Sequence, residues 1–283
     1  MNKSELISRL RQKKLDLSYE VIYKKSTGST NGDAKKSASK NNLLIVAEEQ
    51  TAGKGRYGRS FYSENNGGIY FTIKINNNNN FNINIDDITF YPLIAALSVS
   101  LAVSSVCGIE LSIKWPNDLL YKLPPSPSSS KLDRDAPLKE GGGDVGYRKV
   151  CGILTEASIS GESVSYVIVG IGLNVNNNIT DFPEVLKNTA SSLKIISGAN
   201  KNYNRADVLC KIVENFTRLL RAPRNQILDE YKKRLLLDTD ISFTQNGKIF
   251  KGRAKKINEN GNLIAVLETG EETIIQSGEI NFI

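Results

Sequence analysis

Residues 49–60 read EQTAGKGRYGRS and form the most informative segment of the chain. Glycines alternate here with cations: Gly53, Gly55 and Gly58 with Lys54, Arg56 and Arg59. Glycine lets backbone amides approach a ligand closely, and the cations offset the charge of a phosphate or carboxylate. An ordinary solvated basic loop has a similar composition, so the segment predicts an anion site only in combination with other motifs.

Two familiar nucleotide-binding patterns match this loop superficially. The glycines fit G-x-G-x-x-G, and Gly53-x4-Gly58-Arg59-Ser60 resembles a P-loop with arginine in place of lysine. Both patterns require a helix that begins at the last glycine. Here the chain runs from Gly58 into residues 68–75, GIYFTIKI, which alternate like a strand. We therefore expect neither a dinucleotide fold nor a P-loop, and no NAD.

The composition is that of an ordinary globular protein. Of 283 residues, 40% are hydrophobic and 24% are charged. We find no apolar run near the roughly 20 residues that span a bilayer, and the start MNKSELISRLRQKK lacks the apolar core of a secretory signal. The expected location is the cytoplasm, with organelle import left open and no membrane contact.

The chain contains no histidine, which restricts its chemistry. Ser-His-Asp and Cys-His nucleophiles and histidine-ligated metals are excluded. Cys107, Cys151 and Cys210 are scattered, so we expect reduced thiols and neither zinc nor haem. The net charge of +7 admits a nucleic-acid ligand, but dispersed lysines or a polyphosphate substrate account for it equally well.

Periodicity and turn residues divide the chain into two parts. Helices are expected over 4–14, 29–39, 92–106, 205–220 and 224–236, and strands over 19–25, 43–47, 68–75, 111–115, 119–121, 149–159 and 165–175. Residues 76–80 are an asparagine-rich loop extension, and 123–147, rich in Pro, Ser, Gly and charge, predict a disordered surface insertion. Residues 1–238 then form a mixed α/β catalytic domain and 239–283 a small β-barrel, with hairpin turns at Asn246-Gly247, Asn260-Gly261 and Thr269-Gly270.

Three further motifs accompany the basic loop. Residues 114–118, KWPND, place an amide and a carboxylate at a proline-fixed turn. Residues 149–156, KVCGILTE, begin a strand with a cation, and 169–176, VGIGLNVN, have glycines alternating within a strand, a sign of close approach by a ligand or another backbone. An Asx turn and a plain edge strand are the ordinary alternatives for the first two.

Taken in order from Ser29-Thr30-Asn31 to Gly278-Glu279-Ile280, these motifs resemble those of the biotin protein ligases. The resemblance covers nearly the whole chain. It implies an α+β fold, with a mixed α/β catalytic domain of the biotin/lipoate ligase type and a C-terminal SH3-like β-barrel. It also implies formation of biotinyl-5'-AMP from biotin and ATP with Mg²⁺. The biotinyl group would pass to a lysine of a biotin carboxyl carrier domain, on a monomer or homodimer.

The resemblance also assigns roles to residues. Catalytic roles fall to Arg56, Lys149 and Asp118, and a magnesium role to Asn117 and Asp118. Biotin would contact Ser29, Thr30, Asn31, Gln50, Gly53, Lys54, Gly55, Arg56, Lys149, Gly152 and Gly170. The nucleotide would contact Lys54, Arg56, Arg59, Trp115, Asn117, Lys149 and Asn174.

The chain departs from the family pattern at three positions. Lys54 and Tyr57 stand where arginine is common, and Phe61 replaces a common tryptophan. Lysine lacks the bidentate fork of arginine, so a looser phosphate grip is expected. Too few residues precede Ser29 for the helix-turn-helix of some relatives, so no DNA binding is expected.

Two other functions remain as alternatives. A lipoate or octanoate ligase shares the fold, although KWPND after the basic loop favours biotin. A nucleic-acid-binding protein would need exposed aromatic residues in the β module, whereas the spacing of Phe243 and Phe250 suits a barrel core.

Overall fold

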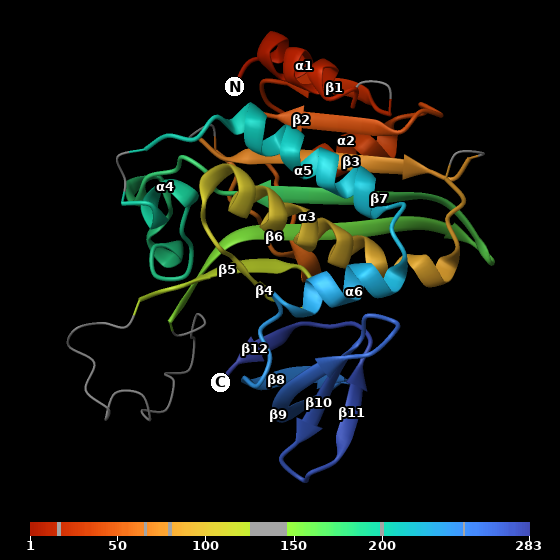
Figure 1. Ribbon diagram of the computed structural model, residues 1–283, viewed down its shortest axis with the longest axis vertical. Coiled ribbons are helices and arrows are strands. Elements are labelled where there is room, and N and C mark those ends of the chain that lie inside the picture. Colours follow the sequence, from red (N-terminus) through yellow and green to blue (C-terminus); the bar gives the residue numbers. More distant parts are fainter. Residues whose placement is uncertain (16–17, 65–66, 79–80, 125–145, 199–200, 246) are drawn as a thin grey trace.

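The structure is a computed structural model that describes residues 1–15, 18–64, 67–78, 81–124, 146–198, 201–245 and 247–283. It contains a seven-stranded mixed sheet and a five-stranded antiparallel sheet. Figure 1 shows the large sheet with its helices above the small C-terminal sheet. The expected fold class, α+β with a mixed α/β domain and a small C-terminal β module, is confirmed.

The large sheet has the strand order β1-β2-β3-β7-β6-β5-β4. Only β1 and β2 pair in parallel, and the other neighbours are antiparallel. The bounds are β1 Glu20–Lys24, β2 Leu43–Ala47, β3 Ile69–Asn76, β4 Ser112–Lys114, β5 Asp118–Lys122, β6 Tyr147–Ser160 and β7 Ser163–Leu173. The long antiparallel pair β6–β7 therefore lies near the middle of the sheet.

Helices cover both faces of this sheet, because β2 has apolar side chains on both of its faces. Leu44 and Val46 belong to the main core with the larger helices, whereas Leu43 and Ile45 pack with Ala34 of α2. The helices are α1 Lys3–Gln12, α2 Thr30–Lys36, α3 Phe90–Cys107, α4 Leu193–Ile196, α5 Arg205–Leu219 and α6 Arg224–Lys232. Figure 1 looks onto the face that α3, α5 and α6 cover.

Helix α3 is apolar all round and lies in the core. With the turn before it, Ile85–Cys107 is long and apolar enough to cross a membrane by length and composition alone. In the fold α3 packs against α5, α6 and the strands β4 to β7. A helix that is hydrophobic on every side is normally buried, and the core accounts for its composition here.

The small sheet has the order β11-β10-β9-β8-β12. Its bounds are β8 Asp240–Gln245, β9 Lys248–Ile257, β10 Leu263–Leu267, β11 Glu272–Ile275 and β12 Ile280–Phe282. Phe243 is buried and stacks on the half-buried Phe250, with ring centroids 5.7 Å apart. These aromatics are therefore core residues, as expected from their spacing, and do not form a stacking platform.

Helices α2 and α6 end three and four residues earlier than the sequence predicts, whereas α1 and α5 end within two residues of the predicted position. Helix α2 ends at Lys36, where Lys74 Nζ donates to the carbonyls of Ala34 and Ser37 at 3.1 and 3.0 Å. Helix α6 ends at Lys232, because the amide of Leu236, which a longer helix would bond to Lys232, donates to the carbonyl of Ile113 in β4 at 2.9 Å. In both cases a contact from a distant strand takes a backbone group that a longer helix would use.

Some expectations concern residues outside the described part of the chain. These are positions 125–145 of the expected insertion, 79–80 of the asparagine run, and Asn246 of the first hairpin turn. The domain boundary between residues 238 and 239 stays a prediction. Buried contacts cross it, since Trp115 Nε1 donates to the carbonyl of Gly261 at 2.9 Å.

Ile73 and Ile249 form a matched pair of strand isoleucines, one fully buried and the other 76% exposed. Ile73→Ala is expected to lower the free energy of unfolding by about 2–5 kcal/mol, because the lost methyl groups leave a cavity. Ile249→Ala is expected to change it by less than about 0.5 kcal/mol. Urea denaturation followed by circular dichroism measures both, and equal losses would contradict this packing.

Candidate functional site

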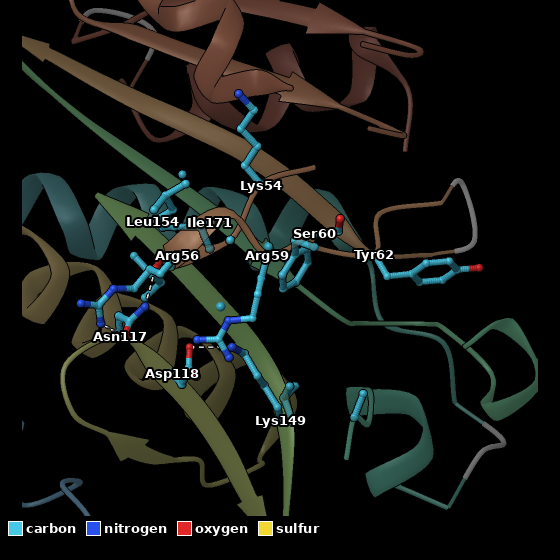
Figure 2. Close-up of a pocket in the computed structure, with 18 of the residues that line it drawn as sticks. Lys54, Arg56, Arg59, Ser60, Tyr62, Asn117, Asp118, Lys149, Leu154 and Ile171 are labelled. Carbon is cyan, nitrogen blue, oxygen red and sulfur yellow. Dashed lines mark hydrogen bonds and ion pairs between the residues drawn. The ribbon is translucent and has the colours of Figure 1, made fainter. Parts of the chain in front are cut away.

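A pocket of about 370 Å³ lies on the face of the large sheet that α2 partly covers. Its floor is the β6–β7 pair. Its walls are the start of α2, the basic loop 54–62, the 114–118 turn, the 182–190 segment and residues 279–281 at the start of β12. Segments far apart in the sequence thus converge on one cavity (Figure 2).

One end of the pocket is a network of hydroxyl and amide groups. Ser29 caps α2, and its hydroxyl accepts from the amide of Gly32. The Gln50 side-chain carbonyl accepts from both the amide and the hydroxyl of Thr30, at 2.9 and 3.0 Å. Asn31 is buried, accepts from Thr72 at 2.6 Å and donates to Glu156 at 3.0 Å. This end presents fixed neutral hydrogen-bonding groups, which suit a polar uncharged head group.

The floor is built from glycines whose missing side chains make room for other groups. A Cβ on Gly170 would lie 2.2 Å from Asn31 Oδ1, and one on Gly172 would lie 2.3 Å from the ring of Phe61. A Cβ on Gly152 would lie 3.0 Å from the same ring. The alternating glycines were predicted to allow close approach by another group. In the structure the approaching groups are the side chains of Asn31 and Phe61.

The other end of the pocket gathers cations that have protein partners. Arg56 donates to the Asn117 carbonyl oxygen at 3.2 Å, and Lys149 pairs with Asp118 at 2.7 Å. Figure 2 shows these two pairs side by side, with the Arg59 head group beside them. Such a cluster can hold an anion with several charges.

Arg59 pairs with Glu279, which lies beside β12. Its hydrogen bond to that carboxylate raises the pKa of the Arg59 guanidinium above its usual value. The ion pair fastens the basic loop to the small sheet.

The amide and indole groups expected near a nucleotide are buried at this end. Asn117 donates to the Ile153 carbonyl at 2.6 Å, and Asn174 donates to that of Ser191 at 3.0 Å. Trp115 is held by its bond to Gly261. Each side chain is therefore fixed before any ligand arrives.

Cys151 lies in β6 directly beside this floor and is fully buried. Burial raises the pKa of its thiol well above the usual value. A thiol held neutral is a poor nucleophile, so the pocket offers no thiolate chemistry at this position. Cys107, Cys151 and Cys210 are all free, as expected from their scatter.

The pocket brings together every predicted site residue except Gly53. A Cβ on Gly53 would lie 2.4 Å from the Phe61 carbonyl and 2.8 Å from Ser63 Oγ, so this glycine lets the two ends of the loop approach each other. Lys54 is exposed, and Figure 2 shows its side chain directed away from Asp118 and Lys149. The ligand contacts assigned to these residues stay predictions.

Sequence reasoning missed one wall of the pocket. Phe182, Leu186, Thr189 and Ala190 line it, although no motif marked them. They reach the site because the Lys149 amide donates to the Thr189 carbonyl at 2.8 Å, a contact between segments 40 positions apart in numbering. Such a pairing has no local signal, and the unremarkable composition of 182–190 gave none.

Comparison with known proteins agrees with this architecture. Residues 19–174 match the Biotin/lipoate A/B protein ligase family, which covers more than half of the chain. The chain belongs to this family.

Several named proteins and solved structures are similar to this chain. The bifunctional ligase/repressor BirA of Bacillus spizizenii is 30% identical, over 89% of this chain and 70% of that protein. A biotin--[acetyl-CoA-carboxylase] ligase of Mycobacterium tuberculosis is 27% identical, over 89% of this chain and 84% of that protein. The biotin protein ligase from Aquifex aeolicus, solved in complex with biotin and ATP, has a TM-score of 0.71 at 27% identity, covering 93% of this chain and 98% of that chain.

Gly170→Ala is expected to displace the Asn31 side chain and break its hydrogen bond from Thr72, because the new Cβ would clash with Asn31 Oδ1. The free energy of unfolding should fall by about 1–3 kcal/mol, since a buried hydrogen bond is lost. Gly28→Ala is the matched control, because a Cβ there meets nothing within 4 Å. Chemical denaturation compares the two variants, and an equally stable Gly170→Ala protein would show that Asn31 is not held as described.

Proposed function

We propose that the chain is a biotin protein ligase that forms biotinyl-5'-AMP from biotin and ATP and transfers the biotinyl group to a lysine of a carrier domain. One observation carries this proposal: a single pocket joins a neutral hydrogen-bonding end to a cationic end. Gly170 and Asn174 mark the two ends on β7 and its extension, and four strand residues span about 13 Å. That arrangement suits an uncharged head group and a carboxylate joined by a chain.

The cationic end supports the first step, in which two anions must meet. The biotin carboxylate oxygen attacks the α-phosphorus of ATP, a carboxyl–phosphate bond forms, and the bond to the β-phosphate breaks as pyrophosphate leaves. Lys149, Arg56 and Arg59 offset the repulsion and the charge that develops on the phosphate oxygens. Their present partners, Asp118, Asn117 and Glu279, hold them in place beforehand.

Magnesium fits this site only in company with the nucleotide. Among the described residues no three carboxylate, cysteine or histidine side chains gather to hold a metal. Mg²⁺ is usually bound by one or two carboxylates together with substrate phosphates, and Asp118 is the carboxylate in position to take part. Asn117 already accepts from Arg56 and is the weaker candidate. Bound there, Mg²⁺ would neutralise phosphate charge.

The second step needs a neutral amine and a protected acyl phosphate. An ordinary lysine has a pKa near 10.4, so about one in a few thousand is neutral at pH 7. Asp118 is half-buried beside the phosphate-binding cations and can orient the amine as it attacks the acyl carbon and AMP leaves. Residues 54–57 of the glycine loop line the pocket, and closing of this loop over the mixed anhydride would exclude water.

The wider setting follows from the same proposal. The carrier is the biotin carboxyl carrier domain of a biotin-dependent carboxylase, which the name of the Mycobacterium tuberculosis relative supports. The reaction takes place in the cytoplasm, on a monomer or a homodimer. Biotin rather than lipoate is the acid, since the names of the relatives and of the aligned structure specify biotin.

Lys149→Ala and Arg56→Ala are expected to lower biotin-dependent release of pyrophosphate by about 10²–10³-fold, because each removes a charge that stabilises the transition state. Lys251→Ala on β9, exposed on the small sheet, is the matched control. Pyrophosphate release is measured with biotin and with lipoic acid in parallel. Release with lipoic acid alone would replace the proposed activity by that of a lipoate ligase.

Asp118→Ala is expected to slow transfer to the carrier more than adenylate formation, because the carboxylate acts on the incoming amine. The two half-reactions are measured separately, by pyrophosphate release and by the mass added to a carrier domain from preformed biotinyl-5'-AMP. Asp118→Asn keeps the size of the side chain and serves as the matched variant. Equal losses in both half-reactions would argue against this division of labour.

A further inference from the structure

Glu156 is the last residue of the 149–156 motif, and the proposed reaction gives it no role. It lies on the face of β6 that carries Gly152 and Leu154, since alternate residues of a strand share a face. Leu154 lines the pocket, whereas Glu156 lies two residues farther along, beyond the lining. Its carboxylate nevertheless reaches the start of α2, where Oε2 accepts from Asn31 Nδ2 at 3.0 Å. A carboxylate behind the pocket therefore touches a side chain that lines it.

The carboxylate of Glu156 is itself held in a defined orientation. Its other oxygen, Oε1, accepts from Lys35 Nζ at 2.6 Å, and Lys35 lies one helical turn after Asn31 on α2. Each oxygen thus serves one of the two helix residues. The Lys35 and Glu156 side chains are 47% and 30% exposed, so solvent screens their ion pair and it adds little to stability. Its effect is to direct Oε2 toward Asn31.

The Asn31 amide uses both of its hydrogens on β6. A carboxylate in an ion pair only accepts hydrogen bonds, and so does a backbone carbonyl. Nδ2 therefore faces Glu156, and its second contact is the Leu154 carbonyl at the longer distance of 3.4 Å. Asn31 is buried, so the surrounding protein decides how its amide is turned. The amine end of this amide is occupied before a ligand arrives.

The oxygen end of the same amide keeps the capacity to accept. Oδ1 accepts from Thr72 at 2.6 Å and lies over the bare backbone of Gly170, where a Cβ would come within 2.2 Å. An amide oxygen has two lone pairs, so one remains after the contact with Thr72. Asn31 therefore offers a ligand an acceptor and no donor. Without Glu156 the amide could turn over, because its two ends differ little in size and shape.

We propose that Glu156 is a positioning residue that fixes the orientation of the Asn31 amide and so makes Asn31 an acceptor for an N–H group of the acid. The inference rests on the proposed ligase function and extends it, since the cyclic urea of biotin carries N–H donors. Glu156 acts through Asn31 and does not touch the acid. An acid that turned an acceptor toward Asn31 would be rejected, because two acceptors would then face each other without a hydrogen.

The first test measures binding of each substrate alone. Isothermal titration calorimetry gives Kd for biotin and, separately, Kd for ATP, for wild type, Glu156→Ala and Glu156→Gln. Glu156→Ala is expected to raise Kd for biotin by about 10–100-fold, the effect of losing a hydrogen bond to a charged group, and to leave Kd for ATP unchanged. Glu156→Gln keeps a carbonyl oxygen for Asn31, so its rise should be smaller. It also serves if the alanine variant fails to fold.

Two control variants separate the orientation of Asn31 from other effects of Glu156. Lys35→Met removes the ion pair to α2 and leaves the contact with Asn31, so Kd for biotin should change by less than about threefold. Glu162→Ala removes an exposed carboxylate from the turn between β6 and β7 and should change nothing.

A double-mutant cycle tests whether Glu156 acts through Asn31. Kd for biotin is compared for Asn31→Ala and for Asn31→Ala/Glu156→Ala. With no amide left to orient, the second substitution should raise Kd no further, although it raises Kd by about 10–100-fold in the wild-type background. Two residues that acted independently would give the same increase in both backgrounds.

The outcomes distinguish failure of the proposed function from failure of the role of Glu156. If wild type binds no biotin, the proposed function fails and the role of Glu156 fails with it. If wild type binds biotin and Glu156→Ala binds it as tightly, the role of Glu156 alone is overturned. That role is also overturned if Glu156→Ala weakens ATP binding equally, if Lys35→Met has the same effect, or if the loss persists in the Asn31→Ala background.

Discussion

The pocket depends on one kind of contact, in which side chains pack directly against the glycine backbone of β6 and β7. On one face of β6 and β7, Gly152, Gly170 and Gly172 leave the sheet bare, and Asn31 and Phe61 lie directly on it. Any Cβ at these positions would meet them at 3.0 Å or less. Glycine weakens a strand, and here the cost is offset because β6 and β7 are long and lie near the middle of the sheet. The floor of the pocket is therefore stable, and its glycines leave room that any side chain would fill.

The electrostatic design follows from this floor. The cations Arg56, Arg59 and Lys149 at one end of the pocket are each held by a nearby acceptor, so their charges are concentrated there. The Lys149–Asp118 pair lies within the large sheet, whereas the Arg59–Glu279 pair joins the basic loop to the small sheet. Because such pairs are partly exposed, each stabilises the fold only slightly, and their value lies in positioning. A polyphosphate can then exchange for these partners with little reorganisation.

The small sheet contributes to the site as well as to the core. Its Gly261 carbonyl holds the indole of Trp115, and residues 279–281 form part of the pocket wall. Phe243 lies in its interior and stacks on the half-buried Phe250, so these two rings serve the core of the module. The module is therefore better understood as a part of the enzyme that closes the site than as an independent binding domain.

The sequence by itself determined the order of the elements, the position of the loop 53–58 and the face on which the strand glycines lie. These depend on period-two alternation and on local turn chemistry, which are written in neighbouring residues. Only the tertiary structure decided that Gly53 packs inside the loop, that α6 stops where Ile113 pairs with the chain, and that residues 182–190 wall the pocket. Those outcomes depend on contacts between residues far apart in the chain, and no local pattern encodes which distant partner takes a free carbonyl or fills the space above a glycine.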